Sequence, residues 1–235
     1  TLGNHEWDYG QDVLKQRISE AKYLYVNSNV TGVNLGWKPN VVKNVAGVNI
    51  GFFGVLTTDL PIIVAPSSLT GVGVADPIAT AKDQIAALKA DGAQYIVALS
   101  HCGYENGGAP LDPAIAAGAP GINLIIGGHS HTVLATAQKV GSTLITQTGT
   151  AGAFVGKEVI DFTTYQGAVT SQNVYYELVP TATTVPENPA IKAIVDGYNS
   201  QLTAQMNVVI GKAMVNLNGE RADVRTKETN LGNYV

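Results

Sequence analysis

Two apolar segments, the unbroken run Tyr95–Leu99 and the segment Ile122–Ile126, which contains a single Asn, are each followed within three residues by histidine. Apolar runs of this length without alternation are typical of strands that are covered on both faces of a sheet. In layered α/β folds, ligands gather outside the carboxyl ends of such strands. His101 follows the first run, and His129 and His131 follow the second. The chain is therefore predicted to form a layered α/β fold with a functional site at one edge of its sheet.

The rest of the first 180 residues alternates between helical and strand patterns. Asp76 is expected to cap a helix over 77–90, because Pro77 suits the first helical position. The segment 57–73 contains Pro61 and Pro66 and is interpreted as a loop. The other patterns predict a helix over 12–22, a hairpin over 41–45 and 48–56, and strands over 23–26, 142–147, 154–162 and 173–179.

A different organisation begins near residue 181. The segment 181–189 is rich in Thr and Pro and is interpreted as a linker. Asn188 and Pro189 then start a predicted helix over 190–206 with one apolar face. A strand is expected over 208–215.

All four histidines of the chain, His5, His101, His129 and His131, stand beside Gly, Asn or Ser. Any one of them alone is more often a packed or surface residue. Together they indicate a metal centre, because neutral imidazole and the carbonyl oxygen of Asn4 suit divalent ions. His129 and His131 are two residues apart, so in an extended turn both side chains would face one cavity.

These residues carry a resemblance to a known family. The run from Gly3 to Asp8 (GNHEWD), Ser100-His101 and the run from Gly127 to Thr132 (GGHSHT) resemble, in order, three blocks of the calcineurin-like metallophosphoesterases, specifically the 5′-nucleotidase branch. The segment 224–233 resembles the start of that branch's second domain. The resemblance implies a layered α/β/β/α sandwich, followed by a linker helix and the start of a second α+β domain.

The resemblance also implies roles for single residues. Asn4, His101 and His129 would ligate one divalent ion, and His131 would ligate a second. His5 would act on the phosphoryl group, oriented by Asp8, which is alternatively a helix cap. Glu6 is interpreted as structural. The implied reaction is hydrolysis of nucleoside 5′-monophosphates or related nucleotides with two ions such as Zn²⁺, Mn²⁺ or Mg²⁺.

One departure from the family pattern limits this chain. The family has an Asp-x-His block and a Gly-Asp block ahead of GNHE, and neither precedes Gly3 here. The chain alone is therefore expected to hold at most one ion well and to be inactive by itself. It is interpreted as an internal piece of a longer enzyme, whose further parts it requires.

Arg221 and Arg225 stand four residues apart ahead of Glu228. By the resemblance, arginines at such positions reach the substrate, and guanidinium groups suit phosphate and ribose oxygens. The alternative is a solvated charged loop. The implied domains are a catalytic domain over 1–180, a linker and connecting helix over 181–206, and the start of a substrate-binding domain over 207–235.

Composition narrows the possible partners. The net charge is −4 and only 14% of residues are charged, which argues against binding to nucleic-acid polymers or anionic membranes. No segment has the roughly 18 apolar residues of a membrane span. Cys102 is the only cysteine and is interpreted as a small buried residue, although a redox or ligand role is an alternative. By the resemblance, a small-molecule nucleotide is the expected partner, in an extracellular, periplasmic or cell-surface location.

Two other readings remain open from the sequence. The same fold could hydrolyse cyclic nucleotides, nucleotide-sugars or sulfur esters. Alternatively, the chain could be a catalytically incomplete fragment that serves in binding or packing.

Overall fold

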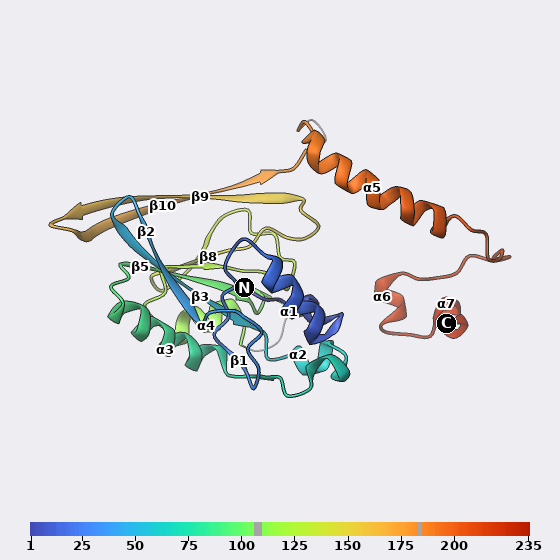
Figure 1. Cartoon of the computed structure of the whole chain (residues 1–235), viewed down its shortest axis with the longest axis horizontal. Helices are drawn as coiled ribbons and strands as arrows, with labels where there is room; N and C mark the ends of the chain where they lie inside the picture. Colours follow the sequence, from blue (N-terminus) through green and yellow to red (C-terminus); the bar gives the residue numbers. More distant parts are fainter. Residues whose placement is uncertain (106–109, 183–184) are drawn as a thin grey trace. The chain divides into compact units, whose positions relative to one another are not determined.

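The computed structural model describes residues 1–105, 110–182 and 185–235, and of Arg221 it describes only the backbone. The chain divides into two compact units, Thr1–Ala182 and Thr183–Val235 (Figure 1). No helix in the described ranges combines the length and the apolar character needed to cross a bilayer.

A six-stranded mixed sheet forms the centre of the first unit, in the order β2-β3-β5-β6-β8-β7. The inner neighbours β3, β5, β6 and β8 are parallel, and the outer strands β2 and β7 run antiparallel to them. The predicted hairpin is confirmed as β2 and β3. The strands are β2 (Asn40–Val45), β3 (Val48–Leu56), β5 (Tyr95–His101), β6 (Leu124–Ile126), β7 (Gln138–Val140) and β8 (Thr143–Thr146).

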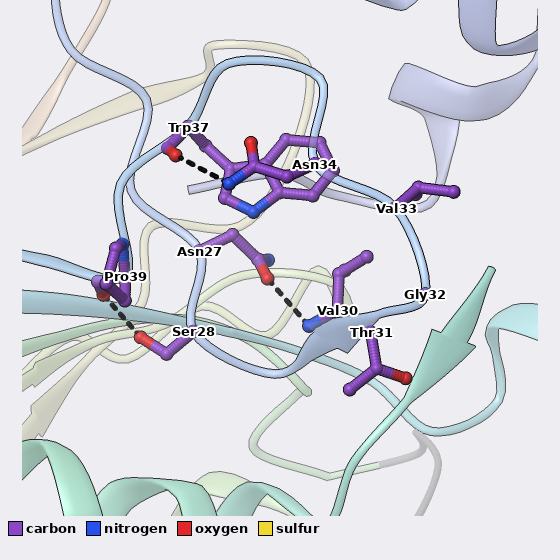
Figure 2. A pocket seen from close by; sticks show the side chains of 9 residues that line it. All are labelled: Asn27, Ser28, Val30, Thr31, Gly32, Val33, Asn34, Trp37 and Pro39. Carbon is purple, nitrogen blue, oxygen red and sulfur yellow. Dashed lines mark hydrogen bonds between the residues drawn. The ribbon is translucent and has the colours of Figure 1, made fainter.

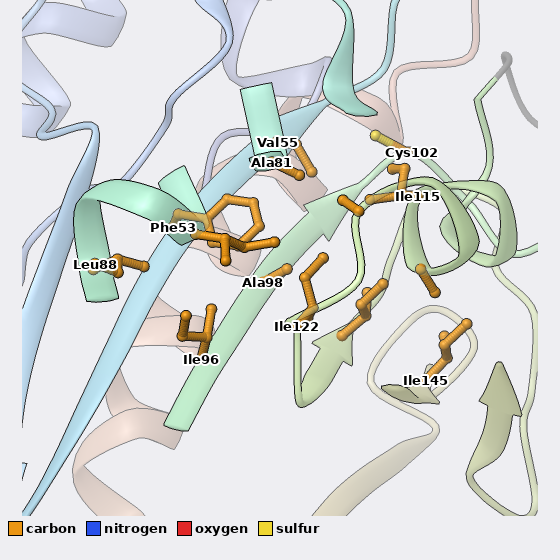
Figure 3. Close-up of a cluster of buried hydrophobic side chains, with 14 of the residues drawn as sticks. Phe53, Val55, Ala81, Leu88, Ile96, Ala98, Cys102, Ile115, Ile122 and Ile145 are labelled. Carbon is orange, nitrogen blue, oxygen red and sulfur yellow. The ribbon is translucent and has the colours of Figure 1, made fainter. Parts of the chain in front are cut away.

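Two helices, α3 (Pro77–Ala90) and α4 (Asp112–Gly118), pack on one face of this sheet. Alternate residues of β5 point toward them, and Ile96 and Ala98 join the main core, together with Ile125 and others (Figure 3). The predicted cap of α3 is confirmed, because the Asp76 side chain accepts a hydrogen bond from the Ala79 amide at 2.7 Å.

A long antiparallel hairpin, β9 (Phe154–Tyr165) and β10 (Ala168–Pro180), packs on the opposite face. Tyr95 and Val97 of β5 point that way, and the Tyr95 ring meets Phe162 edge-on with centroids 5.3 Å apart. Both faces of β5 are therefore covered, which explains its unbroken apolar sequence. The predicted layered α/β fold is confirmed, and its central sheet is mixed.

The N-terminal segment builds a second core around Trp7 and Trp37, whose rings meet edge-on. It contains η1 (His5–Trp7), α1 (Gly10–Glu20) and the short pair β1 (Val30–Thr31) and β4 (Gly73–Val74).

Two predictions in this region are wrong. Residues 23–26 form no strand, and Val26 makes only an isolated bridge to Lys38. The predicted loop over 57–73 contains α2 (Leu60–Ile63) and a 3-10 helix, η2 (Pro66–Leu69). Its prolines stand in the first turns of these short helices, where a missing N–H costs nothing.

The second unit contains α5 (Pro189–Met206), α6 (Arg221–Val224) and α7 (Asn230–Tyr234). The predicted α5 is confirmed, and the Asn188 side chain caps it by accepting from the Ala190 and Ile191 amides. The strand predicted over 208–215 is wrong. Val208, Val209 and Ile210 are exposed, and among the described residues no strand pairs with this segment.

Candidate active site

The carboxyl ends of β5 and β6 bring together histidines that lie far apart in the sequence. His101 is the last residue of β5, and the loop 127–132 leaves the end of β6. These strands are parallel neighbours, with Leu99 beside Ile126. The His101 and His129 rings consequently lie with their centroids 5.0 Å apart.

Asn4 completes this cluster from the N-terminal segment. The His101 Nε2 and Asn4 Oδ1 atoms are 3.0 Å apart. Because an amide oxygen can only accept, Nε2–H is the donor in this hydrogen bond. In the other His101 tautomer, with the proton on Nδ1, both atoms would present a lone pair to the same small space. A divalent ion that bound there would have one nitrogen and one oxygen ligand, a donor set that suits zinc or manganese.

Two glycines make room for the His101 ring. A Cβ on Gly3 would lie 2.7 Å from His101 Cε1, and a Cβ on Gly128 would lie 3.4 Å from Nδ1. The Gly3 amide also donates to the Glu6 carboxylate, which closes the turn that carries Asn4. Glu6 thus has the structural contact expected from the sequence.

His5 and Asp8 form a separate pair at the surface of the first unit. His5 Nδ1 lies 2.8 Å from Asp8 Oδ2, and the His5 side chain is 80% exposed. The carboxylate accepts from Nδ1–H, so Nε2 faces outward. This arrangement orients an accessible imidazole, as in other carboxylate–histidine pairs.

The half-buried imidazoles of His101 and His129 are neutral near pH 7. Burial, reinforced by His129, His5, the chain's amino group and His131, lowers the pKa of His101 to about 4. Burial also lowers the pKa of His129, while the nearby Asp59 carboxylate opposes that shift. Only neutral imidazole ligates a metal, and both rings are neutral at neutral pH.

The loop that carries His129 and His131 departs from the predicted extended turn. The φ angles of His129 and His131 are 76° and 58°, in the left-handed region that residues with a Cβ seldom occupy. The prediction of an extended segment is wrong. Strained backbone of this kind persists where the surrounding structure imposes it and is concentrated at functional sites. His131 is exposed, and it still contributes to the lowered pKa of His101.

A buried polar layer beneath this loop was not anticipated from the sequence. Asp112 is fully buried and accepts from the Ser100 hydroxyl, and burial raises the pKa of Asp112 to about 7. Gln147 accepts from the Thr132 amide at 2.7 Å. Asp112 precedes Pro113 at the start of α4, a pattern that ordinarily signals only a helix start. Asp59, near His129, was also missed, because its only sequence signal is a proline two residues later.

Cys102 has no reactive character. Its side chain is fully buried in the main core, and burial raises the pKa of the thiol to about 12. The interpretation as a small buried residue agrees with this environment.

The structure brings Asn4, His101 and His129 together, and pairs His5 with Asp8. Within the described ranges, no group of three or more His, Cys, Asp or Glu side chains is arranged to hold an ion. The donor set at His101 combines imidazole nitrogen with an amide oxygen, so these residues fit a site with mixed nitrogen and oxygen ligands.

The predicted substrate arginines belong to the second unit. Arg225 follows α6 and is exposed. Arg221 begins α6, and its side chain lies outside the described residues.

A pocket of about 530 Å³ lies elsewhere in the first unit, in the loop before β2 (Figure 2). Its wall includes Asn27 and Trp37, and Asn27 accepts from the Val30 amide. None of the nine residues that line it is a predicted site residue.

Comparison with known proteins shows the family of the chain. Residues 1–133 match the family model described as calcineurin-like phosphoesterase. The chain is 28% identical to the trifunctional nucleotide phosphoesterase protein YfkN of Bacillus subtilis and 25% identical to human 5′-nucleotidase. Both similarities cover 100% of this chain, but the chain spans only 18% and 44% of the respective relatives. The crystal structure of a 5′-nucleotidase precursor from Thermus thermophilus is similar over 99% of this chain and 48% of its own length, with 31% identity and a TM-score of 0.74.

Proposed function

Since the chain belongs to the calcineurin-like phosphoesterase family, we propose that it provides the catalytic site of a nucleotide phosphohydrolase. The proposed substrates are nucleoside 5′-monophosphates or related nucleotides. The convergence of Asn4, His101 and His129 at the carboxyl edge of the sheet carries this proposal. The relatives named as 5′-nucleotidase and nucleotide phosphoesterase support a nucleotide over a sugar or sulfur ester.

In the proposed site, Asn4 Oδ1, His101 and His129 hold one divalent ion, and His131 holds a second in a longer protein. When bound, such ions supply Lewis-acid polarisation of the phosphoryl oxygens. His101 and His129 are neutral at neutral pH, so they need no deprotonation to ligate. We propose that the ions are Zn²⁺, Mn²⁺ or Mg²⁺, with two bound in the longer protein.

His5 is proposed to act on the phosphoryl group and not on a metal. Asp8 accepts from Nδ1–H and fixes the ring, and the exposed Nε2 is accessible to a bound phosphate ester. Protonated His5 would stabilise charge that develops on the phosphoryl oxygens or donate its Nε2 proton to the leaving oxygen.

The remaining assignments extend to the whole chain. Residues 1–180 are proposed as the catalytic domain, 181–206 as linker and connecting helix, and 207–235 as the start of a substrate-binding domain. Arg221 and Arg225 are proposed to contact the nucleotide. An extracellular, periplasmic or cell-surface location is proposed by analogy with the 5′-nucleotidase branch.

Metal titration tests the site directly. We expect calorimetry with Mn²⁺ or Zn²⁺ to give at most one tight ion per chain, since four candidate ligands are present. His101→Ala should abolish that binding, whereas His5→Asn should leave it unchanged. Loss of binding in His5→Asn would make His5 a ligand, and two tight ions in the unaltered chain would contradict the proposed ligand set.

The catalytic role requires a longer protein that contains this chain. There, His5→Asn should lower the turnover of AMP by roughly 10²–10⁴-fold without loss of metal. An equal loss of metal and turnover would reject the assignment of His5 to the phosphoryl group.

A further inference from the structure

Gly127 lies between two buried polar side chains whose free ends face the same point. A Cβ on Gly127 would overlap Asp112 Oδ2 and would lie 3.2 Å from Gln147 Nε2. Both atoms are buried, and neither has a hydrogen-bond partner among the described residues. When Asp112 is ionised its Oδ2 is an acceptor, and Gln147 Nε2 is a donor, so their polarities are complementary.

The orientation of the Gln147 amide is fixed by its other end. Its Oε1 atom accepts from the Thr132 amide at 2.7 Å and from the Ser130 hydroxyl at 3.1 Å. Because a backbone N–H can only donate, Oε1 must face Thr132. Nε2 must then face Gly127. Gln147 is therefore bound to the loop that carries His129 and His131.

Asp112 is bound to the other ligand segment in the same way. Its Oδ1 atom accepts from the Ser100 hydroxyl, and its amide donates to the Gly103 carbonyl at 2.8 Å. These two contacts bracket His101. No Lys or Arg forms an ion pair with the Asp112 carboxylate in the described part of the chain.

We propose that Asp112 and Gln147 act as a pair of positioning residues, which clamp Gly127 and hold the His101 segment in register with the His129 loop. The inference rests on the proposed function only where it extends to metal affinity. Neither side chain reaches the imidazoles, so both act through the segments that they hold. The backbone at His129 and His131 is strained and needs support, because an unsupported loop would relax to ordinary φ angles.

A swap of donor and acceptor tests the pair. Asp112→Asn places two amide NH₂ groups around Gly127, and Gln147→Glu places two carboxyl groups there. The double variant, Asp112→Asn with Gln147→Glu, restores one donor and one acceptor. Its carboxylate can still accept from Thr132 and Ser130. Thr143→Val serves as the matched control, because it removes a buried hydrogen bond to the Ile122 carbonyl elsewhere on the sheet.

The first measurement needs no metal. Hydrogen exchange of the Gly127 and Thr132 amides should quicken at least tenfold in each single variant and return toward the original rate in the double variant. Thr143→Val should leave both amides unchanged. Unchanged exchange in the single variants, or a double variant that exchanges faster than either single one, would overturn the pairing.

The second measurement uses Co²⁺ as the probe, with its d–d absorption as the signal. Loss of supporting contacts around metal ligands typically costs 10–100-fold in affinity, so each single variant should bind Co²⁺ at least tenfold more weakly, with rescue in the double variant. Equal Co²⁺ affinity in all variants would overturn the positioning role. A third outcome is that the unaltered chain binds no Co²⁺, while amide exchange quickens in the single variants and is restored in the double variant. That outcome would support the Asp112–Gln147 pair and reject the proposed metal centre.

Discussion

Apolar side chains are buried in the first unit of this chain and exposed in the second. In the first unit, Phe53 and Ile125 are 0% exposed at the centre of a layered core. In the second, α5 has a comparable apolar stripe, yet Ile194 and Leu202 are more than half exposed and no residue of the helix is buried. Periodicity thus specifies a helix, whereas burial also requires a partner surface.

Core truncation should give the largest contrast between the units. Phe53→Ala is expected to lower the free energy of unfolding of the first unit by about 3–5 kcal/mol, because it leaves a cavity under α3. Leu202→Ala in α5 should change stability by no more than about 0.5 kcal/mol. Urea denaturation followed by tryptophan fluorescence measures the first unit, which contains both Trp7 and Trp37. A comparable loss in both variants would show that α5 is buried against something in solution.

Glycine substitutions should have opposite signs in the two units. A Cβ on Gly54 would overlap the Val26 carbonyl oxygen, whereas a Cβ on Gly197 meets nothing within 4 Å. Gly54→Ala should therefore destabilise the first unit by about 1–3 kcal/mol. Gly197→Ala should raise the stability of α5 by roughly 0.5–1 kcal/mol, because alanine loses less backbone entropy in a helix. Circular dichroism on heating reports α5, and a loss of helix in Gly197→Ala would contradict its open surroundings.

The corresponding functional prediction is that the first unit acts on the phosphoryl group and Arg225 of the second unit binds the nucleotide. In a longer protein, Arg225→Ala should raise the KM for AMP roughly tenfold, since hydrogen bonds to charged groups contribute about 1.5–3 kcal/mol. Hydrolysis of p-nitrophenyl phosphate should change little, because that ester has no nucleoside. Equal slowing of both substrates would assign Arg225 to the phosphoryl group or to folding.

The last prediction concerns pH and the first unit alone. The pKa of Asp112 is raised by burial to about 7, so between about pH 4 and 7 the folded chain keeps a proton that the unfolded chain releases. Stability from this group therefore falls as pH rises through that window, by at most about 1.4 kcal/mol per pH unit. His101 acts oppositely, because its lowered pKa makes the folded chain lose stability as pH falls from about 6.5 to 4.

Asp112→Asn isolates this contribution. In the metal-free chain, the variant should gain stability relative to the unaltered protein as pH rises from about 5 to 7. Denaturant titrations at several pH values measure the difference. A difference that does not vary with pH would show that Asp112 is already ionised in the folded chain.

Strand periodicity and helix caps predicted most of the first unit. The apolar run of β5 indicated a strand covered on both faces, and Asp76 with Pro77 marked the start of α3. The same reasoning failed over 23–26 and 208–215. Apolar residues there have strand propensity, but a ladder of hydrogen bonds also needs a neighbouring strand, and local sequence does not specify one.

The site was predictable to the extent that its residues stand in motifs. Asn4, His101 and His129 were identified from their glycine and serine neighbours, and the structure brings them together. Asp112 and Gln147 stand in no motif and contact the site only through the fold. The left-handed backbone at His129 and His131 was likewise unpredictable, because both residues carry a Cβ and ordinarily avoid it.

The hydrogen bond from His101 to Asn4 has a consequence for how an ion would enter. His101 is neutral near pH 7 and carries its single proton on Nε2, the nitrogen that faces Asn4. Ligation at Nε2 therefore requires the other tautomer, with the proton on Nδ1. Ion uptake at this ring is a tautomer exchange without a change of charge. On metal binding, the ¹⁵N resonance of His101 Nδ1 should become that of a protonated nitrogen, and the Nε2 resonance should become that of an unprotonated one. This ring itself should release no proton to the buffer.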